Sequence, residues 1–299
     1  MKKLLRVVGW IVLGVILLGA ALAATAQILS DHKLKRVVHV EVAPLEVARD
    51  AAALARGKYL YDTRGCMECH GGDGGGRVVV DDASGFYVRS PNITHGAGSP
   101  VEQYKSEDWA RTIRHGIKPN AHPLLVMPSE DYNQMTDEDL GAIVAYVETL
   151  KPIPSGPAEF RLPILVRALY VAGAIQDASE KVDHSLLPPS TAQAQSDPGA
   201  YLANGCRGCH GAGFSGGAIP GAPPSWPPAA NLTSSTDGAM SRYSTVQEFA
   251  AMLRTGIRPD ASPVSEVMPF ESLKNLSDEE ISSLFQFLKK LPSRPSGGR

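Results

Sequence analysis

The sequence has few cysteines, few aromatic residues and no excess of charge of either sign. Its 299 residues include 4 cysteines, and aromatic side chains make up 6%. Basic and acidic residues number 29 and 31, so the formal net charge of −2 gives no general attraction to nucleic acid or to anionic lipid. Four cysteines are too few for a disulfide scaffold. An apolar fraction of 43% excludes a disordered chain and is sufficient for packed globular domains.

Long uncharged apolar runs are absent except at the N-terminus. The run from Val7 to about Ala26 has roughly the 20 residues that a helix needs to cross the hydrocarbon core of a bilayer. Residues 1–30 are therefore expected to be a transmembrane anchor or a signal. The segment Ala24-Thr25-Ala26 has the form of a cleavage site, but the run exceeds the usual length of a signal peptide, which favours an anchor. Lysine and arginine flank both ends, so charge does not set the orientation.

Two parts of the chain repeat the same motifs at a separation of about 140 residues. The segment Cys66-Met67-Glu68-Cys69-His70 has its counterpart in Cys206-Arg207-Gly208-Cys209-His210. Three further pairs keep the same order: Asn92-Ile93-Thr94 with Asn231-Leu232-Thr233, Gly116-Ile117-Lys118-Pro119 with Gly256-Ile257-Arg258-Pro259, and Val126-Met127-Pro128 with Val267-Met268-Pro269. The chain is therefore a tandem duplication of one small unit.

Each unit is expected to be helical. Thr136 with Asp139 resembles a capping box, and apolar residues recur after it at helical spacing up to Val147. The second unit has the same signal at Ser277 and at Thr245. Strand signals are almost absent, and long loops rich in glycine and proline need a surface on which to pack.

The predicted fold class is all-α, with two tandem helical domains behind one N-terminal transmembrane helix. The expected divisions are 1–30 for the anchor or signal, 31–50 for a juxtamembrane tether, 51–157 for the first domain, 158–196 for a linker, 197–292 for the second domain and 293–299 for a tail. The linker, which contains an apolar run at 162–170, is expected to pack between the two domains.

The repeated Cys-x-x-Cys-His motif is the attachment sequence for c-type haem. Its two thiols form thioether bonds to the porphyrin's vinyl groups, and its histidine ligates the iron. A spacing of two residues lets one helical turn present both sulfurs to the haem edge. The residues predicted to bind two covalently attached haems are Cys66, Cys69 and His70 in the first copy and Cys206, Cys209 and His210 in the second. The haems would supply the surface on which the long loops pack.

Two other interpretations of the cysteine pairs are a zinc half-site and a redox disulfide. Zinc needs four ligands, and the pairs lack the βαβ context of a redox motif. Neither interpretation explains why a methionine recurs in both copies.

Met127 and Met268 are the methionines that coincide between the copies, 57 and 58 residues after His70 and His210. A single methionine is usually a core residue, but two in register, each before proline, favour axial ligands to the iron. Met135 is a competitor in the first copy, although it aligns with Leu276. Ligation by histidine and methionine favours reduced iron and leaves no open position for oxygen or peroxide, which is typical of electron transfer.

Other polar residues near the motifs have less specific interpretations. His95, His115 and His122 align with no histidine in the second copy, so surface or propionate contacts are expected of them. The repeated asparagines and threonines, and the pair Arg114 and Arg254, could bind haem propionates. Turn formation and a solvated helix face are the alternatives.

Residues from about Ala51 to Pro292 resemble the class I-like dihaem cytochrome c family, in particular the cytochrome subunits that serve membrane-bound bacterial dehydrogenases for alcohols, aldehydes, sugar acids or nicotinate-type substrates. The resemblance rests on the four repeated motifs above. It implies cytochrome c-like helical domains with long haem-packing loops, a periplasmic location, and electron delivery toward a quinone pool or an oxidase. Several of those subunits carry three haems, whereas this chain has two attachment motifs, so the resemblance does not identify the partner.

The expected function is therefore a membrane-anchored electron relay, without catalysis of its own, between a dehydrogenase donor and a respiratory-chain acceptor. The acceptor could be a quinone-linked complex, an oxidase or a soluble cytochrome. Haem attachment follows export, so residues from about Asp31 onward would lie in the periplasm, beside the bacterial inner membrane. A dihaem peroxidase-like or thiosulfate-type oxidoreductase would need one open iron, which the two methionines disfavour. A purely structural anchor for a dehydrogenase is a third possibility.

Overall fold

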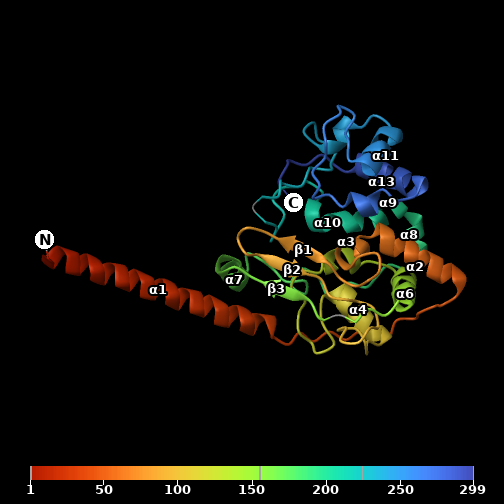
Figure 1. Ribbon diagram of the computed structural model, residues 1–299. Helices are drawn as coiled ribbons and strands as arrows, with labels where there is room; N and C mark the ends of the chain where they lie inside the picture. Colours follow the sequence, from red (N-terminus) through yellow and green to blue (C-terminus); the bar gives the residue numbers. More distant parts are fainter. Residues whose placement is uncertain (1, 155, 224, 299) are drawn as a thin grey trace.

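One long N-terminal helix projects from a body made of short helices and loops (Figure 1). The structure is a computed structural model that describes residues 2–154, 156–223 and 225–298. Residues 1, 155, 224 and 299 belong to the predicted anchor, first domain, second domain and tail, and they lie outside the described residues.

The two copies of the repeat have the same helices in the same order. The first has α2 (Ala51–Thr63), α3 (Cys66–His70), α4 (Ser106–His115), α5 (Ser129–Tyr132) and α6 (Asp137–Glu148). The second has α9 (Pro198–Ala203), α10 (Arg207–His210), α11 (Val246–Thr255), α12 (Phe270–Leu273) and α13 (Asp278–Lys290), with 3-10 turns at Asn204–Cys206 and Ala239–Arg242. The intervening segment holds α7 (Ile164–Val171) and α8 (Thr191–Ser196). The prediction of a mostly helical, duplicated fold is confirmed.

The N-terminal helix α1 spans Lys2–Leu34. It is long and apolar enough to cross a membrane, with a mean hydropathy of 2.6 over its most apolar window, and none of that window is buried against the protein. The expected apolar helix is therefore present, and it continues past Ala26 to Leu34, beyond the end of the uncharged run.

In each domain the first and last helices cross at a glycine. A Cβ atom at Gly57 of α2 would overlap the carbonyl oxygen of Ala142 in α6, and a Cβ at Gly199 of α9 would overlap that of Ser283 in α13. Only glycine permits such an approach of two backbones. The repeated glycine therefore sets how closely the helices that enclose each core can pack.

The helix starts expected from the sequence are confirmed. The Thr136 hydroxyl accepts a hydrogen bond from the Asp139 N–H at 3.1 Å, and the Ser277 hydroxyl accepts one from the Glu280 N–H at 3.1 Å. The Thr245 hydroxyl accepts from the Glu248 N–H at 3.3 Å. Each bond satisfies a backbone donor that the first helical turn leaves without a partner.

The structure contains a three-stranded antiparallel sheet that the sequence did not predict. Its strands are β1 (Val78–Asp81), β2 (Tyr87–Arg89) and β3 (Glu159–Arg161), in the order β1-β2-β3. The β-branched residues on either side of the turn at Gly85 are a hairpin signal. Where the second copy would form this hairpin, it has several prolines, which cannot donate to a strand ladder. At this place in the second copy, the described residues form an isolated bridge between Gly217 and Ala229.

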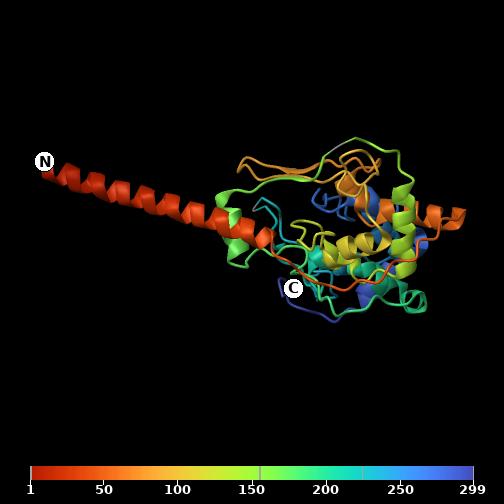
Figure 2. The same ribbon diagram turned by 90° about the horizontal axis from the view of Figure 1, so that it is seen from below.

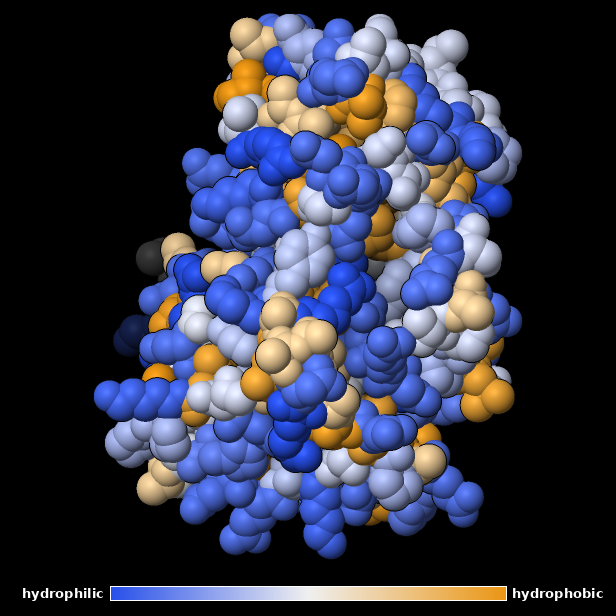
Figure 3. Space-filling model, turned by 90° about the vertical axis from the view of Figure 1, so that its right-hand side faces the viewer, coloured by the Kyte–Doolittle hydropathy of each residue, from blue (hydrophilic) through white to orange (hydrophobic). Residues whose placement is uncertain are grey.

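Part of the linker lies elsewhere than expected, since its apolar run 162–170 is not between the two domains. This run forms most of α7, which packs beside the C-terminal part of α1 (Figures 1 and 2). Residues 35–50, the part of the predicted tether 31–50 that follows α1, are also packed. The Val38 N–H donates to the Ala121 carbonyl at 2.8 Å, and Leu45 lies in the first domain's core. The face turned away from α1 is mostly hydrophilic, with apolar residues in small separate groups (Figure 3).

We expect Gly57→Ala to destabilise the folded haem protein by about 2 kcal/mol or more, because the added methyl group must push α2 away from α6. Thermal unfolding followed by circular dichroism measures the change. Gly156→Ala is the matched control, since a Cβ there meets no atom within 4 Å. Equal melting temperatures for the two variants would show that the close crossing is not required.

Candidate functional site

Each Cys-x-x-Cys-His motif forms a single turn of helix that ends at a glycine. Gly71 and Gly211 follow the two histidines with φ of 78° and 79°, a region that strains other residues. Their N–H groups donate to the carbonyls of Met67 and Arg207 at 3.0 and 2.8 Å. The chain can therefore turn sharply away after each histidine, which keeps the motif helix short.

Both motif histidines are oriented by a backbone carbonyl. Nδ1 of His70 lies 3.1 Å from the Pro91 carbonyl oxygen, and Nδ1 of His210 lies 2.7 Å from that of Ala230. A carbonyl only accepts hydrogen bonds, so Nδ1 carries the proton and Nε2 keeps its lone pair for a metal. Burial lowers the pKa of His70, which favours the neutral form that a ligand needs.

The four cysteines are partly buried thiols. None of the four, all within the described residues, forms a disulfide. Burial raises the pKa of Cys66 and of Cys206 to about 12, whereas redox-active pairs have lowered pKa values. The described residues also contain no group of three histidine, cysteine or acidic side chains that could hold a metal ion. The raised pKa values of Cys66 and Cys206 are therefore not those of a redox-active pair.

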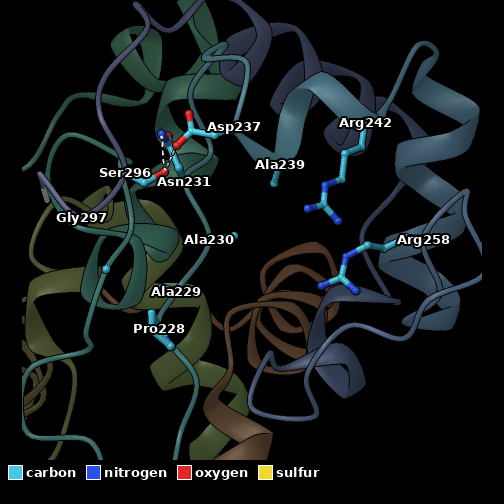
Figure 4. A pocket seen from close by; sticks show the side chains of 11 residues that line it. Pro228, Ala229, Ala230, Asn231, Asp237, Ala239, Arg242, Arg258, Ser296 and Gly297 are labelled. Atoms are coloured by element: carbon cyan, nitrogen blue, oxygen red, sulfur yellow. Dashed lines mark hydrogen bonds between the residues drawn. The ribbon is translucent and has the colours of Figure 1, made fainter.

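A cavity of about 420 Å³ lies beside the second motif. Its lining includes Ala230, whose carbonyl holds His210, and the guanidinium groups of Arg242 and Arg258 point into it (Figure 4). In the first copy Lys118 occupies the repeat position of Arg258, and burial lowers the pKa of Lys118. Haem carries two carboxylates, which cations bind through charge-assisted hydrogen bonds. The thiols, the oriented histidines and these cations fit a haem group.

The repeated methionines occupy equivalent positions. Met127 and Met268 lie two residues before α5 and α12, and both are partly buried. Met268 packs against the same core cluster as Cys206. Met135, in contrast, is buried in the first domain's core, where it is 6% exposed. Leu276, its counterpart in the second copy, is likewise buried and 3% exposed.

The other repeated polar residues hold the loops around the motifs. The Asn92 side-chain oxygen accepts from the Thr94 N–H at 2.8 Å, and that of Asn231 accepts from the Thr233 N–H at 2.9 Å, which is the turn-forming role. Arg114 and Arg254 donate to the carbonyls of Met135 and Leu276, respectively.

The three histidines without a counterpart in the second copy, His95, His115 and His122, each contact another protein atom. Nδ1 of His115 lies 3.1 Å from Nδ1 of His184, and Nδ1 of His95 lies 3.2 Å from the Glu102 carbonyl. Nδ1 of His122 lies 3.2 Å from the Arg36 carbonyl.

The two domains exchange equivalent hydrogen bonds, which the sequence analysis missed. The Tyr201 hydroxyl accepts from the Thr136 N–H at 3.1 Å and donates to the Asp139 carboxylate at 2.8 Å. At the corresponding positions, the Tyr59 hydroxyl accepts from the Ser277 N–H at 2.9 Å and donates to the Glu280 carboxylate. The domains are therefore related by a pseudo-twofold axis, as in an isologous dimer.

The motif helices themselves take part in this contact. The Glu68 carboxylate, between Cys66 and Cys69, accepts from the Ser272 N–H at 2.8 Å. The Asp131 carboxylate accepts from the N–H of Gly208, which lies between Cys206 and Cys209, at 2.8 Å. One feature of the sequence could have indicated this interface, because tyrosine occurs at equivalent positions of the two copies, Tyr59 and Tyr201. Both attachment motifs lie where the domains meet.

Comparisons with known proteins agree with the duplicated geometry. Residues 52–147 match the family described as cytochrome c oxidase, cbb3-type, subunit III, and residues 196–292 match the family described as cytochrome c. The chain is 28% identical to a fructose dehydrogenase cytochrome subunit of Gluconobacter japonicus, over 94% of this chain and 60% of the relative.

Two further relatives are also cytochrome c subunits of dehydrogenases. One is the cytochrome c subunit of a quinone alcohol dehydrogenase from Gluconobacter oxydans (strain 621H), which is 28% identical over 83% of this chain and 56% of the relative. The other is a gluconate 2-dehydrogenase cytochrome c subunit of Pantoea cypripedii, 26% identical over 81% of this chain and 60% of the relative. The chain thus spans less than two thirds of the length of these relatives.

We expect the interface carboxyl of Asp131 to make stability depend on pH. Burial raises the pKa of Asp131 to about 7, whereas an unfolded aspartate ionises near pH 4. Between these values the unfolded chain loses a proton that the folded chain keeps, so stability falls as the pH rises, by at most about 1.4 kcal/mol per pH unit. Chemical denaturation of the haem protein at pH 4 to 8 measures this slope.

Asp131→Asn should remove that slope, because the amide oxygen still accepts from Gly208 but does not ionise. Asp82→Asn is the control, since hydrogen bonds from Ser84 lower the pKa of this exposed carboxyl and confine its effect to acid pH. An unchanged slope in Asp131→Asn would show that another group causes it.

Proposed function

We propose that this chain, which consists of two cytochrome c domains behind an apolar N-terminal helix, relays electrons between a dehydrogenase and the respiratory chain. Its two covalently bound c-type haems supply one-electron redox chemistry. The observation that carries the proposal is the placement of both attachment motifs, α3 and α10, at the contact between the domains.

The residues proposed to hold the haems are repeated in the two domains. Cys66, Cys69, Cys206 and Cys209 would form the thioether bonds, and Nε2 of His70 and of His210 would ligate the two irons. Met127 and Met268 would provide the sixth ligands. The repeat register and the core location of the competitor Met135 support this assignment. Two filled axial positions on each iron leave no site for a substrate, so the chain would act as a carrier and not as a catalyst.

The interface would hold the two redox sites in one fixed arrangement. Glu68 and Asp131 connect each motif helix to a backbone N–H of the other domain, and Arg64 pairs with Glu280 at 2.9 Å across the same contact. A rigid contact would keep the separation of the sites constant and exclude water from the space between the motif helices. Electrons could then pass between the domains without leaving the protein.

The proposal also includes where the chain lies in the cell and which proteins it exchanges electrons with. The helix α1 would anchor the chain in the bacterial inner membrane, with the haem domains in the periplasm, where haem is attached after export. The named relatives are subunits of dehydrogenases for fructose, alcohol and gluconate, so the donor would be a dehydrogenase for a sugar, an alcohol or a sugar acid. The acceptor would be a quinone-linked complex, an oxidase or a soluble cytochrome.

Replacement of either repeated methionine by leucine should open one iron. We expect Met127→Leu and Met268→Leu each to bind carbon monoxide at one haem per chain, measured by difference spectra of the reduced protein. Met135→Leu is the matched control, because leucine is the natural residue at its repeat position, and it should not respond. Carbon monoxide binding in the control but not in Met127→Leu would reassign the ligand of the first domain.

Removal of the thioether bonds should separate an electron relay from a structural anchor. We expect Cys66→Ser/Cys69→Ser and Cys206→Ser/Cys209→Ser each to lose one covalent haem and to lower electron flux from the dehydrogenase to oxygen by at least about tenfold, an activation difference of about 1.4 kcal/mol or more. The measurements are haem-stained denaturing gels and oxygen uptake by membranes, normalised to the amount of dehydrogenase that co-purifies. Unchanged flux per recovered complex would support the anchor and contradict the relay.

A further inference from the structure

The linker helix α7 has one face made entirely of exposed apolar residues. Ile164, Leu165 and Leu169 are 46%, 67% and 38% exposed, and Ala168 is exposed between them. These positions recur as i, i+1, i+4 and i+5, so they share one side of the helix. The other side faces the protein, where Tyr170 is fully buried. A helix with such a face requires a partner that covers apolar surface.

The position of α7 indicates what covers this face. Nη1 of Arg167 donates to the Ser30 hydroxyl and to the Asp31 carboxylate of α1, each at 2.7 Å. Nζ of Lys33 donates to the Tyr170 carbonyl at 2.8 Å and lies 4.2 Å from the centre of the Tyr170 ring. Figure 2 shows α7 lying across the C-terminal part of α1. The exposed face of α7 is therefore next to the proposed membrane span.

The contact with α1 sets the depth of α7. Ser30 lies four residues after Ala26, the end of the apolar run, which corresponds to about 6 Å along a helix. The headgroup layer on each side of the hydrocarbon core is about 5–7 Å thick. Ile28 and Leu29 of α1 are also 67% and 48% exposed at this level. One surface, continuous from α1 to α7, would thus lie at the boundary between headgroups and acyl chains.

The helix is fixed to the haem domains before it meets any partner. Nη2 of Arg36 donates to the Asp177 carboxylate at 2.9 Å, and the Tyr170 hydroxyl donates to the same carboxylate at 2.7 Å. Asp177 is followed by Ala178, whose N–H donates to the Leu124 carbonyl of the first domain at 2.9 Å. Because α7 is already ordered, its apolar face can enter a bilayer surface with little loss of conformational entropy.

We propose that α7 is an interfacial helix that lies on the bilayer with Ile164, Leu165 and Leu169 in the lipid. Together with α1 it gives the haem domains two points of contact with the membrane, and so sets their orientation toward membrane-bound partners. This inference rests on the proposed anchoring by α1. Continuity with α1 favours lipid over a protein subunit as the occupant of the face.

The test uses the full haem-loaded chain in nanodiscs of phosphatidylethanolamine and phosphatidylglycerol. Leu165→Cys is labelled with a polarity-sensitive fluorophore, since the other cysteines are held in thioether bonds. Quenching by a nitroxide on the lipid acyl chain is compared with quenching by aqueous iodide. Leu187→Cys is the matched control, because Leu187 is 84% exposed in a segment that packs on the haem domains through Lys181 and Glu130.

We expect the ratio of lipid quenching to iodide quenching to be several-fold higher at position 165 than at position 187. Equal ratios would overturn the inference, and so would protection of position 165 from iodide that appears only after the dehydrogenase is added. A label at Ile16→Cys tests the anchor separately. Lipid quenching at position 16 but not at 165 would reject the interfacial helix alone, whereas none at position 16 would reject the anchor.

Discussion

The reciprocal hydrogen bonds of Tyr59 and Tyr201 determine how the two haem domains meet. Each hydroxyl bonds the N-cap turn of the other domain's last helix, at Ser277 and Glu280 or at Thr136 and Asp139. Since both tyrosines extend from the first helix of their own domain, these bonds align the first and last helices of the two domains. The same arrangement brings the motif helices α3 and α10 into the interface, where a carboxylate contacts each of them.

The duplication explains why one interface can serve two sites. A pseudo-twofold axis lets one favourable contact occur twice, so a single tyrosine position and a single acidic position supply both sets of hydrogen bonds. The two copies differ in which group they supply to the contacts with the motif helices α3 and α10. Both of their carboxylates, Glu68 and Asp131, belong to the first domain, and the second domain supplies backbone N–H groups at Ser272 and Gly208. If positions 68, 131, 208 and 272 all carried carboxylates, each of the two contacts would bring two negative charges together.

Much of the fold could be predicted because local patterns determine it. The cap residues, the apolar spacing of α6 and α13 and the repeated Cys-x-x-Cys-His segments each act over a few residues. The sheet β1-β2-β3 was missed because its third strand lies about 70 residues after its second. The position of α7 beside α1 could not be predicted, because the apolar run 162–170 indicates that a partner surface exists but does not identify it. The side chains that join α7 to α1, Arg167 and Lys33, carry no pattern of their own.

The central claim is that both irons are closed and serve electron transfer. The most direct measurement is the visible spectrum of the reduced natural chain with and without carbon monoxide, after its covalent haems are counted by mass. Two haems and an unchanged spectrum are the predicted result, because Met127 and Met268 would fill the sixth positions. Two haems with a clear carbon monoxide response from one of them would contradict the account, since an open iron indicates a catalytic, peroxidase-like site.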